Sequence, residues 1–235
     1  MIAPPRSAKP LKKPPPKKAR VSPAEQARIA EIFRRFEEQE SDPRTELDYS
    51  SPFELITAVA LSAQATDVSV NKATAKLFKV ADTPQKMLQL GEEGLKPFIS
   101  SIGLYNSKAK NVVAMSQILV DQYDGQPPLT REALQALPGV GRKTASVVLN
   151  ELRIEPAIAV DTHVFRVSHR LGLSGGKTPD QVESQLMAIV PDPLKTRAHH
   201  WLILHGRYVC VARRPKCEIC VVADLCPSRR LFTGR

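Results

Sequence analysis

The stretch LPGVGRKTASVVLN, residues 137–150, predicts a tight turn that opens into a helix. Pro138 ends the helix before it, because proline lacks an amide hydrogen and its ring clashes with the preceding turn. Gly139 and Gly141 permit backbone angles and close approaches that other residues obstruct. Together with LTREALQA just before it, the stretch predicts a helix-hairpin-helix over residues 130–150.

The amide groups at this turn and at the start of its second helix lack partners within a helix, and phosphate oxygens suit them. The hairpin residues expected to hold a DNA backbone, without reading its sequence, are Gly139, Val140, Gly141 and Arg142. An ordinary connection between two helices is the alternative interpretation.

Lys143 lies in the first turn of the second helix, where the partial positive charge of the helix start disfavours an ammonium group. Partial burial would act in the same direction. Both effects favour the neutral amine, which is the nucleophilic form. Such an amine is placed to attack C1′ of a sugar, expel the base and form a Schiff base, which permits β-elimination of the strand. A solvated lysine, or a point charge on a phosphate, is the alternative.

Asp161 follows the apolar run 157–160 and precedes another expected helix. Chemistry at a sugar carbon needs a carboxylate that steadies positive charge and moves protons. Asp is also a favoured helix N-cap. The two roles are compatible, because a capping carboxylate is fixed in orientation.

The rest of the chain predicts an all-α fold. Three helix starts share a capping residue, a proline and a Glu or Gln three residues after the cap, at Ser22, Ser51 and Thr178. Further helices are expected near residues 67–79, 84–90, 107–122, 130–136, 142–152, 162–170 and 197–207. No segment alternates persuasively as a strand does.

Charge and composition set limits on the class of protein. The chain has 235 residues and a formal net charge of +10, of which +7 lies in the first twenty residues. A basic balance points to a polyanionic partner. Residues 1–21, rich in Pro and Lys, are expected to be disordered, either as a solvated tail or as a non-specific DNA tether. No apolar run approaches the roughly 20 residues of a membrane span, and no secretory signal is recognisable at the N-terminus.

The four cysteines lie close together, at Cys210, Cys217, Cys220 and Cys226. Their clustering in a chain without a secretory signal argues against disulfides and favours four thiolates around a metal centre. Structural zinc usually takes two paired C-x2-C knuckles, and only one such pair is present. The wider spacing suits a [4Fe–4S] cluster, with zinc as the alternative. Arg213, Arg214 and Lys216 lie between the first two cysteines and are expected to face DNA phosphates or solvent.

Five segments resemble one known family. They are LSAQATDVSVNKATAKL, GLYNSKAKN, LPGVGRKTA, AVDTHVFRV and HHWLILHGRYVC, and together they resemble the bacterial endonuclease III family of iron–sulfur, helix-hairpin-helix DNA glycosylases. The resemblance runs from about residue 24 to 228. It implies two helical domains that flank a DNA-binding cleft. One is a six-helix barrel over residues 45–155, and the other, which joins residues 22–44 to 156–235, carries the [4Fe–4S] cluster.

The resemblance also implies roles for single residues. Lys143 would be the Schiff-base nucleophile and Asp161 its carboxylate partner. Gln64 would fill the gap left by an everted nucleotide, and Leu104 would be an apolar wedge between bases, although a helix-end hydrogen bond and a core position are the simpler interpretations. His163 would line the pocket or be a buried, satisfied histidine.

The function implied is that of a bifunctional glycosylase and abasic-site lyase, which removes oxidised pyrimidines from damaged double-stranded DNA in base excision repair. The lysine separates it from the adenine mismatch glycosylases of the same fold, which lack this lysine and release a base without cutting the strand. We expect a monomer in the bacterial cytoplasm, associated with the nucleoid and not with a membrane. A non-catalytic binder of DNA damage and a zinc-stabilised interaction module are the alternatives. His199, His200 and His205 are interpreted as packing residues.

Overall fold

The computed structural model describes residues 22–233, so the expectations for the basic segment 1–21 lie outside the described residues. Within that range the secondary structure is helical, without a strand, which confirms the predicted all-α class. The α-helices are α1 (Pro23–Gln39), α2 (Pro52–Leu61), α3 (Asp67–Leu77), α4 (Pro84–Ile99), α5 (Tyr105–Tyr123), α6 (Arg131–Gln135), α7 (Arg142–Glu151), α8 (Thr162–Arg170), α9 (Pro179–Ile189) and α10 (Lys195–Tyr208). Three short 3-10 turns follow α9 and α10, at Asp192–Leu194, Ala223–Leu225 and Arg229–Leu231.

The predicted helix starts are confirmed, with one difference in detail. Ser22, Ser51 and Thr178 each accept a hydrogen bond from the amide three residues on, and a proline follows each of them. At α1, however, the side chain of Glu25 does not return to the start of the helix as a capping box would require. It forms an ion pair with Arg28 at 2.5 Å instead.

Helix α4 extends beyond the predicted 84–90. Gly91 interrupts it with φ +66° and ψ 177°, and a second helical segment then continues to Ile99. A glycine adopts this conformation at little cost, so the chain turns there and resumes the helix. The sequence signal ends at Gly91, but the helical structure does not.

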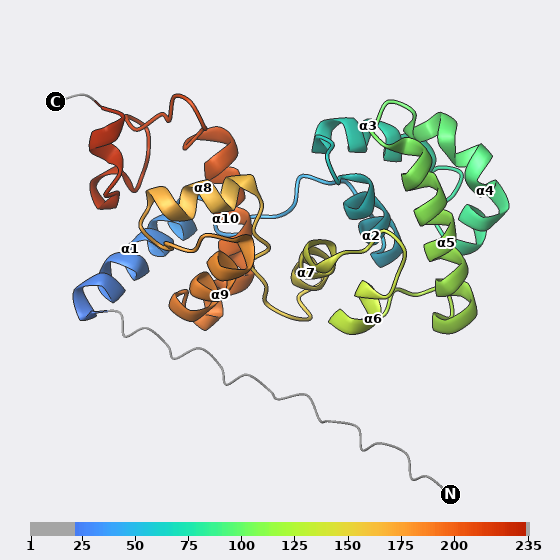
Figure 1. Cartoon of the computed structure of the whole chain (residues 1–235), viewed down its shortest axis with the longest axis horizontal. Helices are drawn as coiled ribbons and strands as arrows, with labels where there is room; N and C mark the ends of the chain where they lie inside the picture. Colours follow the sequence, from blue (N-terminus) through green and yellow to red (C-terminus); the bar gives the residue numbers. More distant parts are fainter. Residues whose placement is uncertain (1–21, 234–235) are drawn as a thin grey trace, which may run out of the picture.

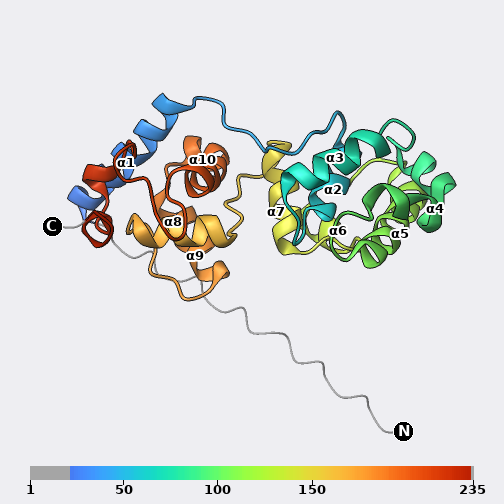
Figure 2. The ribbon, with the colours of Figure 1, turned by 90° about the horizontal axis from the view of Figure 1, so that it is seen from above.

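The helices form two lobes that lie side by side (Figures 1 and 2). The barrel lobe contains the six helices α2 to α7 around one buried apolar cluster, which runs from Leu47 to Leu149 in the sequence. The cluster lobe contains α1, α8, α9, α10 and the cysteine loop, residues 209–228, around a second apolar cluster. From this division we propose the domain boundaries expected above, 45–155 against 22–44 with 156–235, of which residues 22–233 are described.

The two lobes meet along a seam that the chain crosses twice, between α1 and α2 and between α7 and α8. Asn150, at the end of α7, is buried in this seam. Its side-chain nitrogen donates to the Thr196 carbonyl of the cluster lobe at 2.9 Å, and its side-chain oxygen accepts from the Ala157 amide at 3.0 Å. These bonds fix the end of α7 relative to the start of α10.

The two hairpin glycines, Gly139 and Gly141, differ in backbone conformation and in the space around them. Gly139 has φ +78°, and a Cβ added there would lie 3.0 Å from Cβ of Asn111 on α5. Gly141 has φ −83° and nothing within 4 Å of the same position. The turn therefore requires a glycine at 139, whereas the backbone at 141 accepts a side chain.

We expect Gly139→Ala to lower the free energy of unfolding by about 1–2 kcal/mol, because alanine is strained in the left-handed region and also crowds Asn111. Gly141→Ala is the matched control and should change it by less than about 1 kcal/mol. Denaturant unfolding of the two holoproteins, followed by helical circular dichroism, measures both. Equal losses would contradict this assignment.

Candidate active site and DNA interface

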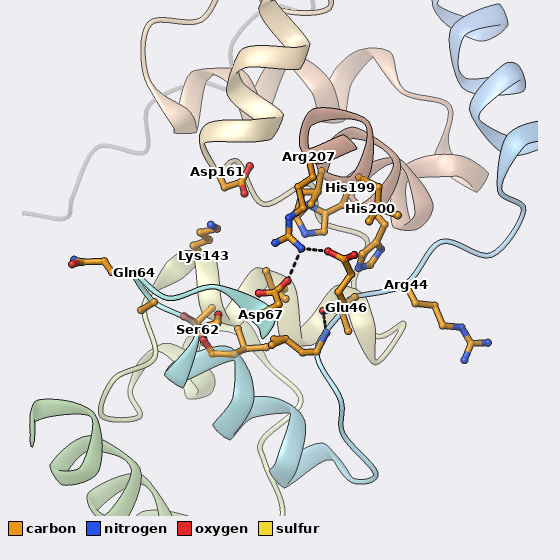
Figure 3. Close-up of a pocket in the computed structure, with 18 residues that line it drawn as sticks. Arg44, Glu46, Ser62, Gln64, Asp67, Lys143, Asp161, His199, His200 and Arg207 are labelled. Carbon is orange, nitrogen blue, oxygen red and sulfur yellow. Dashed lines mark hydrogen bonds and ion pairs between the residues drawn. The ribbon is translucent and has the colours of Figure 1, made fainter. Parts of the chain in front are cut away.

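A pocket of about 190 Å³ lies in the seam between the lobes, with walls from both of them (Figure 3). The barrel lobe contributes Gln64 and Lys143, and the cluster lobe contributes Asp161, His199 and Arg207. The two candidate catalytic residues, far apart in the sequence and in different lobes, therefore line one cavity.

Lys143 is the second residue of α7 and projects into the pocket. Its side chain is exposed, so the partial burial considered from the sequence is not found. The N-cap residue Gly141 offers no side chain to the first amides of α7. The helix start therefore keeps unpaired N–H groups close to the lysine.

Asp161 faces Lys143 across the pocket, from the start of α8 (Figure 3). Its Oδ1 accepts the amides of His163 and Val164, both at 2.8 Å. The carboxylate is thus the N-cap of α8, as one interpretation of the sequence expected. Its second oxygen has no partner among the hydrogen bonds of the described residues and remains available in the pocket.

Gln64 and Leu104 lie on two adjoining loops. Gln64, between α2 and α3, has φ +56°, and Leu104, just before α5, has φ +61°. A Cβ added to Gly103 would lie 3.9 Å from the Gln64 carbonyl, so the loops are close to one another. Both side chains are exposed, Leu104 to 61%, which excludes the simpler interpretation of Leu104 as a core residue. They are two of the four described non-glycine residues with a positive φ, and residues held in this region often lie at functional positions.

The predicted hairpin residues divide into two groups. Gly139, Gly141 and Arg142 are exposed, whereas the Val140 side chain is buried and its amide donates to the Leu137 carbonyl at 3.1 Å. Val140 therefore offers no free amide to a phosphate. The Arg142 guanidinium forms ion pairs with Glu183 at 2.8 Å and Asp180 at 3.1 Å on α9, and so joins the two lobes.

His163 lies beside the pocket and is not part of its wall. Its Nδ1 is 3.3 Å from Nη2 of Arg166, and a Cβ added to Gly206 of α10 would lie 2.9 Å from the Cβ of His163. The contact to α10 favours the interpretation of His163 as a packed residue.

Three charged residues in the pocket wall were not singled out from the sequence. Arg207 on α10 pairs through Nη1 with Asp67 at the start of α3, at 2.6 Å, and with Glu46 of the first crossing segment. They come from three distant parts of the chain and share no motif, so no spacing signal could have found them. Asp67 and Glu46 together keep the pKa of Arg207 above its ordinary value despite burial.

His199 and His200, interpreted from the sequence as packing residues, also line the pocket. Burial above all, followed by electrostatic effects of His200 and Lys143, holds the pKa of His199 well below its ordinary value, so its ring is uncharged at neutral pH. His200 pairs with Glu151 of α7 at 3.0 Å. Burial raises the pKa of Glu151, but the bonds from His200 and Tyr49 outweigh burial, and the pKa lies below its ordinary value.

The cysteine loop is held by arginines of α1 and α8. Arg28 donates to the Leu225 carbonyl at 2.8 Å, and Arg35 donates to the Val221 carbonyl at 2.9 Å. Arg166 donates to the Cys210 carbonyl at 3.1 Å, and Arg170 donates to the Val211 carbonyl at 2.8 Å and to Sγ of Cys210 at 3.4 Å. Four guanidinium groups thus fix a loop that contains little regular structure of its own.

The four cysteines fit an iron–sulfur cluster. All four are free thiols, are partly buried and line one small pocket. A set of four cysteines at this spacing suits a [4Fe–4S] cluster. Arg213, Arg214 and Lys216 are exposed on the same loop.

Two family profiles match the chain. The HhH-GPD superfamily of base excision DNA repair proteins matches residues 57–192, and the iron–sulfur binding domain of endonuclease III matches residues 210–226. The second match covers all four cysteines, so the chain carries a [4Fe–4S] cluster at that position. None of the described helices is long and apolar enough to cross a membrane.

Known proteins resemble the chain over most of its length. It is 58% identical to endonuclease III of Escherichia coli (strain K12) over 200 residues, 85% of this chain and 95% of that protein. It is 56% identical to the Haemophilus influenzae protein over 196 residues, 83% and 93% of the two chains. A structure of a non-covalent endonuclease III–DNA complex matches with a TM-score of 0.82 and 42% identity, over 88% of this chain and 97% of that one. A trapped covalent endonuclease III–DNA intermediate matches with a TM-score of 0.81 at the same identity and coverage. By its sequence, its fold and its cysteine loop, this chain belongs to the endonuclease III family of DNA glycosylases and abasic-site lyases.

Proposed function

We propose that Lys143 is the nucleophile with which this glycosylase and lyase removes oxidised pyrimidines from double-stranded DNA. The observation that carries the proposal is the meeting of Lys143 and Asp161 across one pocket, from two different lobes. The covalent DNA intermediate trapped on a related protein supports a nucleophile of this kind.

The reaction follows from these two side chains. In the proposed step, the amine Nζ of Lys143 forms a bond to C1′ while the bond from C1′ to the base breaks, and the base leaves with the bonding electron pair and takes up a proton. Loss of protons from nitrogen and ring opening of the sugar give a Schiff base. Removal of a C2′ proton then breaks the C3′–oxygen bond, which cuts the strand. The Asp161 carboxylate, held by two amides of α8, stabilises the positive charge on the sugar.

The same geometry supports a proposed grip on bent and opened DNA. The free amides at the start of α7 would hold phosphate oxygens of the backbone, with Gly139 and Gly141 allowing the backbone to approach closely. Gln64 and Leu104, exposed on adjoining loops, would enter the stack where the damaged nucleotide has left it. Arg142 could still donate a hydrogen bond to a phosphate in addition to its two ion pairs, because a guanidinium carries five N–H donors.

The [4Fe–4S] cluster, when bound, links four points of the cysteine loop, and we propose that it thereby holds Arg213, Arg214 and Lys216 in place for DNA phosphates. We also propose that the enzyme acts as a monomer on the bacterial chromosome, in the cytoplasm. Both lobes of a single chain already supply a complete set of site residues.

Borohydride should trap a covalent adduct between the holoprotein and a duplex that contains thymine glycol. Lys143→Gln should abolish both the adduct and strand cleavage, because an amide cannot form an imine. Gel electrophoresis of the trapped protein–DNA complex measures the first and a denaturing gel the second.

Lys110→Gln, on the exposed side of α5, is the control for loss of one surface lysine and should trap as well as the wild type. Adduct formation by Lys143→Gln at the wild-type rate would contradict the assignment of the nucleophile.

We expect the double substitution of Arg213 and Arg214 by Ala to weaken binding to undamaged duplex and to reduce the slope of log Kd against log salt by about 2, one for each lost phosphate contact. Fluorescence anisotropy over a salt series measures this slope. Arg34→Ala, on the outer face of α1, is the control and should leave it unchanged. An unaltered slope in the double variant would place both arginines away from the DNA.

A further inference from the structure

Residues 229–233 follow the cysteine loop and fold back toward it, and we name them the closing turn. The amide of Arg229 donates to the Cys226 carbonyl at 3.2 Å, and the amide of Phe232 donates to the Arg229 carbonyl at 3.0 Å. Phe232 thereby lines the same small pocket as the four cysteines. The closing turn contains no cysteine, and neither the proposed attack by Lys143 nor the proposed grip on DNA uses it.

The chain enters the closing turn from a point that is docked against the end of α8. Gly172, just after this helix, has φ +67°, and a Cβ added there would lie 3.1 Å from Cγ of Pro227. A side chain at position 172 would be strained in the left-handed region and would also crowd Pro227. Glycine at this position lets Pro227 pack closely, so the closing turn begins beside the last turn of α8.

Arg170, the last residue of α8, contacts both ends of the cysteine motif. Its Nη1 donates to the Val211 carbonyl at 2.8 Å and to Sγ of Cys210 at 3.4 Å. Its Nη2 donates to the Ala212 carbonyl at 2.6 Å. The carbonyl oxygen of Arg170 lies 3.3 Å from Sγ of Cys226. One residue of α8 therefore touches the first and the last of the four cysteines.

The ring of Phe232 covers the guanidinium group of Arg170. Cζ of Arg170 lies 4.5 Å from the centroid of this ring, which is within the range of a cation–π contact. Phe232 remains 40% exposed, whereas its neighbour Leu231 is 79% exposed. The ring therefore takes the place of water on one face of the guanidinium. A charged donor with less water around it interacts more strongly with the acceptors that it keeps.

A cation at this position suits the cofactor that the four cysteines hold. Four thiolates give a bound [4Fe–4S] cluster a net negative charge, and N–H donors to its sulfur atoms are among the groups that set its reduction potential. Apolar groups around such a site limit the access of solvent to it. Arg170 provides the donor and Phe232 provides the apolar cover.

We propose that Arg170 and Phe232 form a lid on the cluster site, in which Arg170 donates a hydrogen bond to the thiolate of Cys210 and Phe232 holds Arg170 in place and excludes water. The lid controls two properties of the holoprotein, which are the rate at which iron is lost and the potential at which the cluster is reduced. It acts without DNA and does not depend on the role of Lys143.

A role of Arg170 in folding alone makes a different prediction. Its bonds to backbone carbonyls would then only position the loop, and the reduction potential would not depend on it. Arg35 on α1 provides the comparison, because it donates to the Val221 carbonyl of the same loop but contacts no cysteine sulfur among the described residues.

The first experiment measures the loss of iron from the full-length holoprotein to an excess of EDTA under anaerobic conditions, followed by the visible absorbance of the cluster. We expect Phe232→Ala to lose iron about fivefold or more faster than the wild type, the change expected for one partly desolvated cation–π contact. Phe232→Tyr keeps the ring, and Leu231→Ala removes the exposed neighbour, so both should stay within about twofold of the wild type. An unchanged rate in Phe232→Ala would overturn the proposal.

A double-substitution cycle separates the lid from a general loss of stability. In a protein that already carries Arg170→Met, we expect Phe232→Ala to change the rate of iron loss by less than about twofold, because the ring acts through the guanidinium. Independent, multiplying effects of the two substitutions would show that Phe232 stabilises the lobe by another route and would contradict the proposal.

The second experiment measures the reduction potential of the holoproteins by voltammetry in the absence of DNA. Arg170→Met should lower the potential, because it removes an N–H donor and a positive charge that stabilise the reduced cluster. Arg35→Met removes the same charge from the same loop without a sulfur contact and should shift the potential far less. Equal potentials in Arg170→Met and the wild type would refute the lid. Iron loss from Phe232→Ala decides the proposal even if Arg170→Met assembles no cluster.

Discussion

The site depends on a difference between two helix starts that face each other across the seam. The N-cap of α8 is Asp161, whose carboxylate accepts hydrogen bonds from two amides that have no partner within the helix. The N-cap of α7 is Gly141, which has no side chain to offer, so the first amides of α7 stay free. The start of α8 is therefore capped by a carboxylate that also lines the pocket, whereas the first amides of α7 remain free to bind an anion such as a phosphate.

The seam can hold such a site because each lobe completes its own apolar cluster. The barrel lobe and the cluster lobe each have their own apolar cluster, and polar contacts cross the seam between them, among them Asn150 with Thr196, His200 with Glu151 and Arg207 with Asp67. A polar seam leaves room for a water-accessible cavity, which a continuous apolar core would fill. The proposed reaction needs this arrangement, since Lys143 and Asp161 enter the pocket from different lobes.

The sequence predicted the helices well because their starts are local signals: a cap, a proline and an apolar repeat lie within a few residues of each other. It also predicted the hairpin and the cysteine loop, which depend on short motifs. It missed the second half of α4, because Gly91 looks like an end, and it missed Glu46, Asp67 and Arg207, which only the folded chain brings together. Exposure of Lys143 likewise depends on how the lobes meet, and no local pattern encodes it.

Under the proposed role of Gln64 and Leu104 in the base stack, their left-handed backbone has a consequence for how lesions are found. The conformation is unfavourable by roughly 1–2 kcal/mol at each residue, and the free protein already holds it. Folding of the protein, and not the encounter with DNA, therefore supplies this free energy. Tips that are set in advance suit rapid inspection of many intact base pairs, because ordering their backbone adds no cost at each encounter.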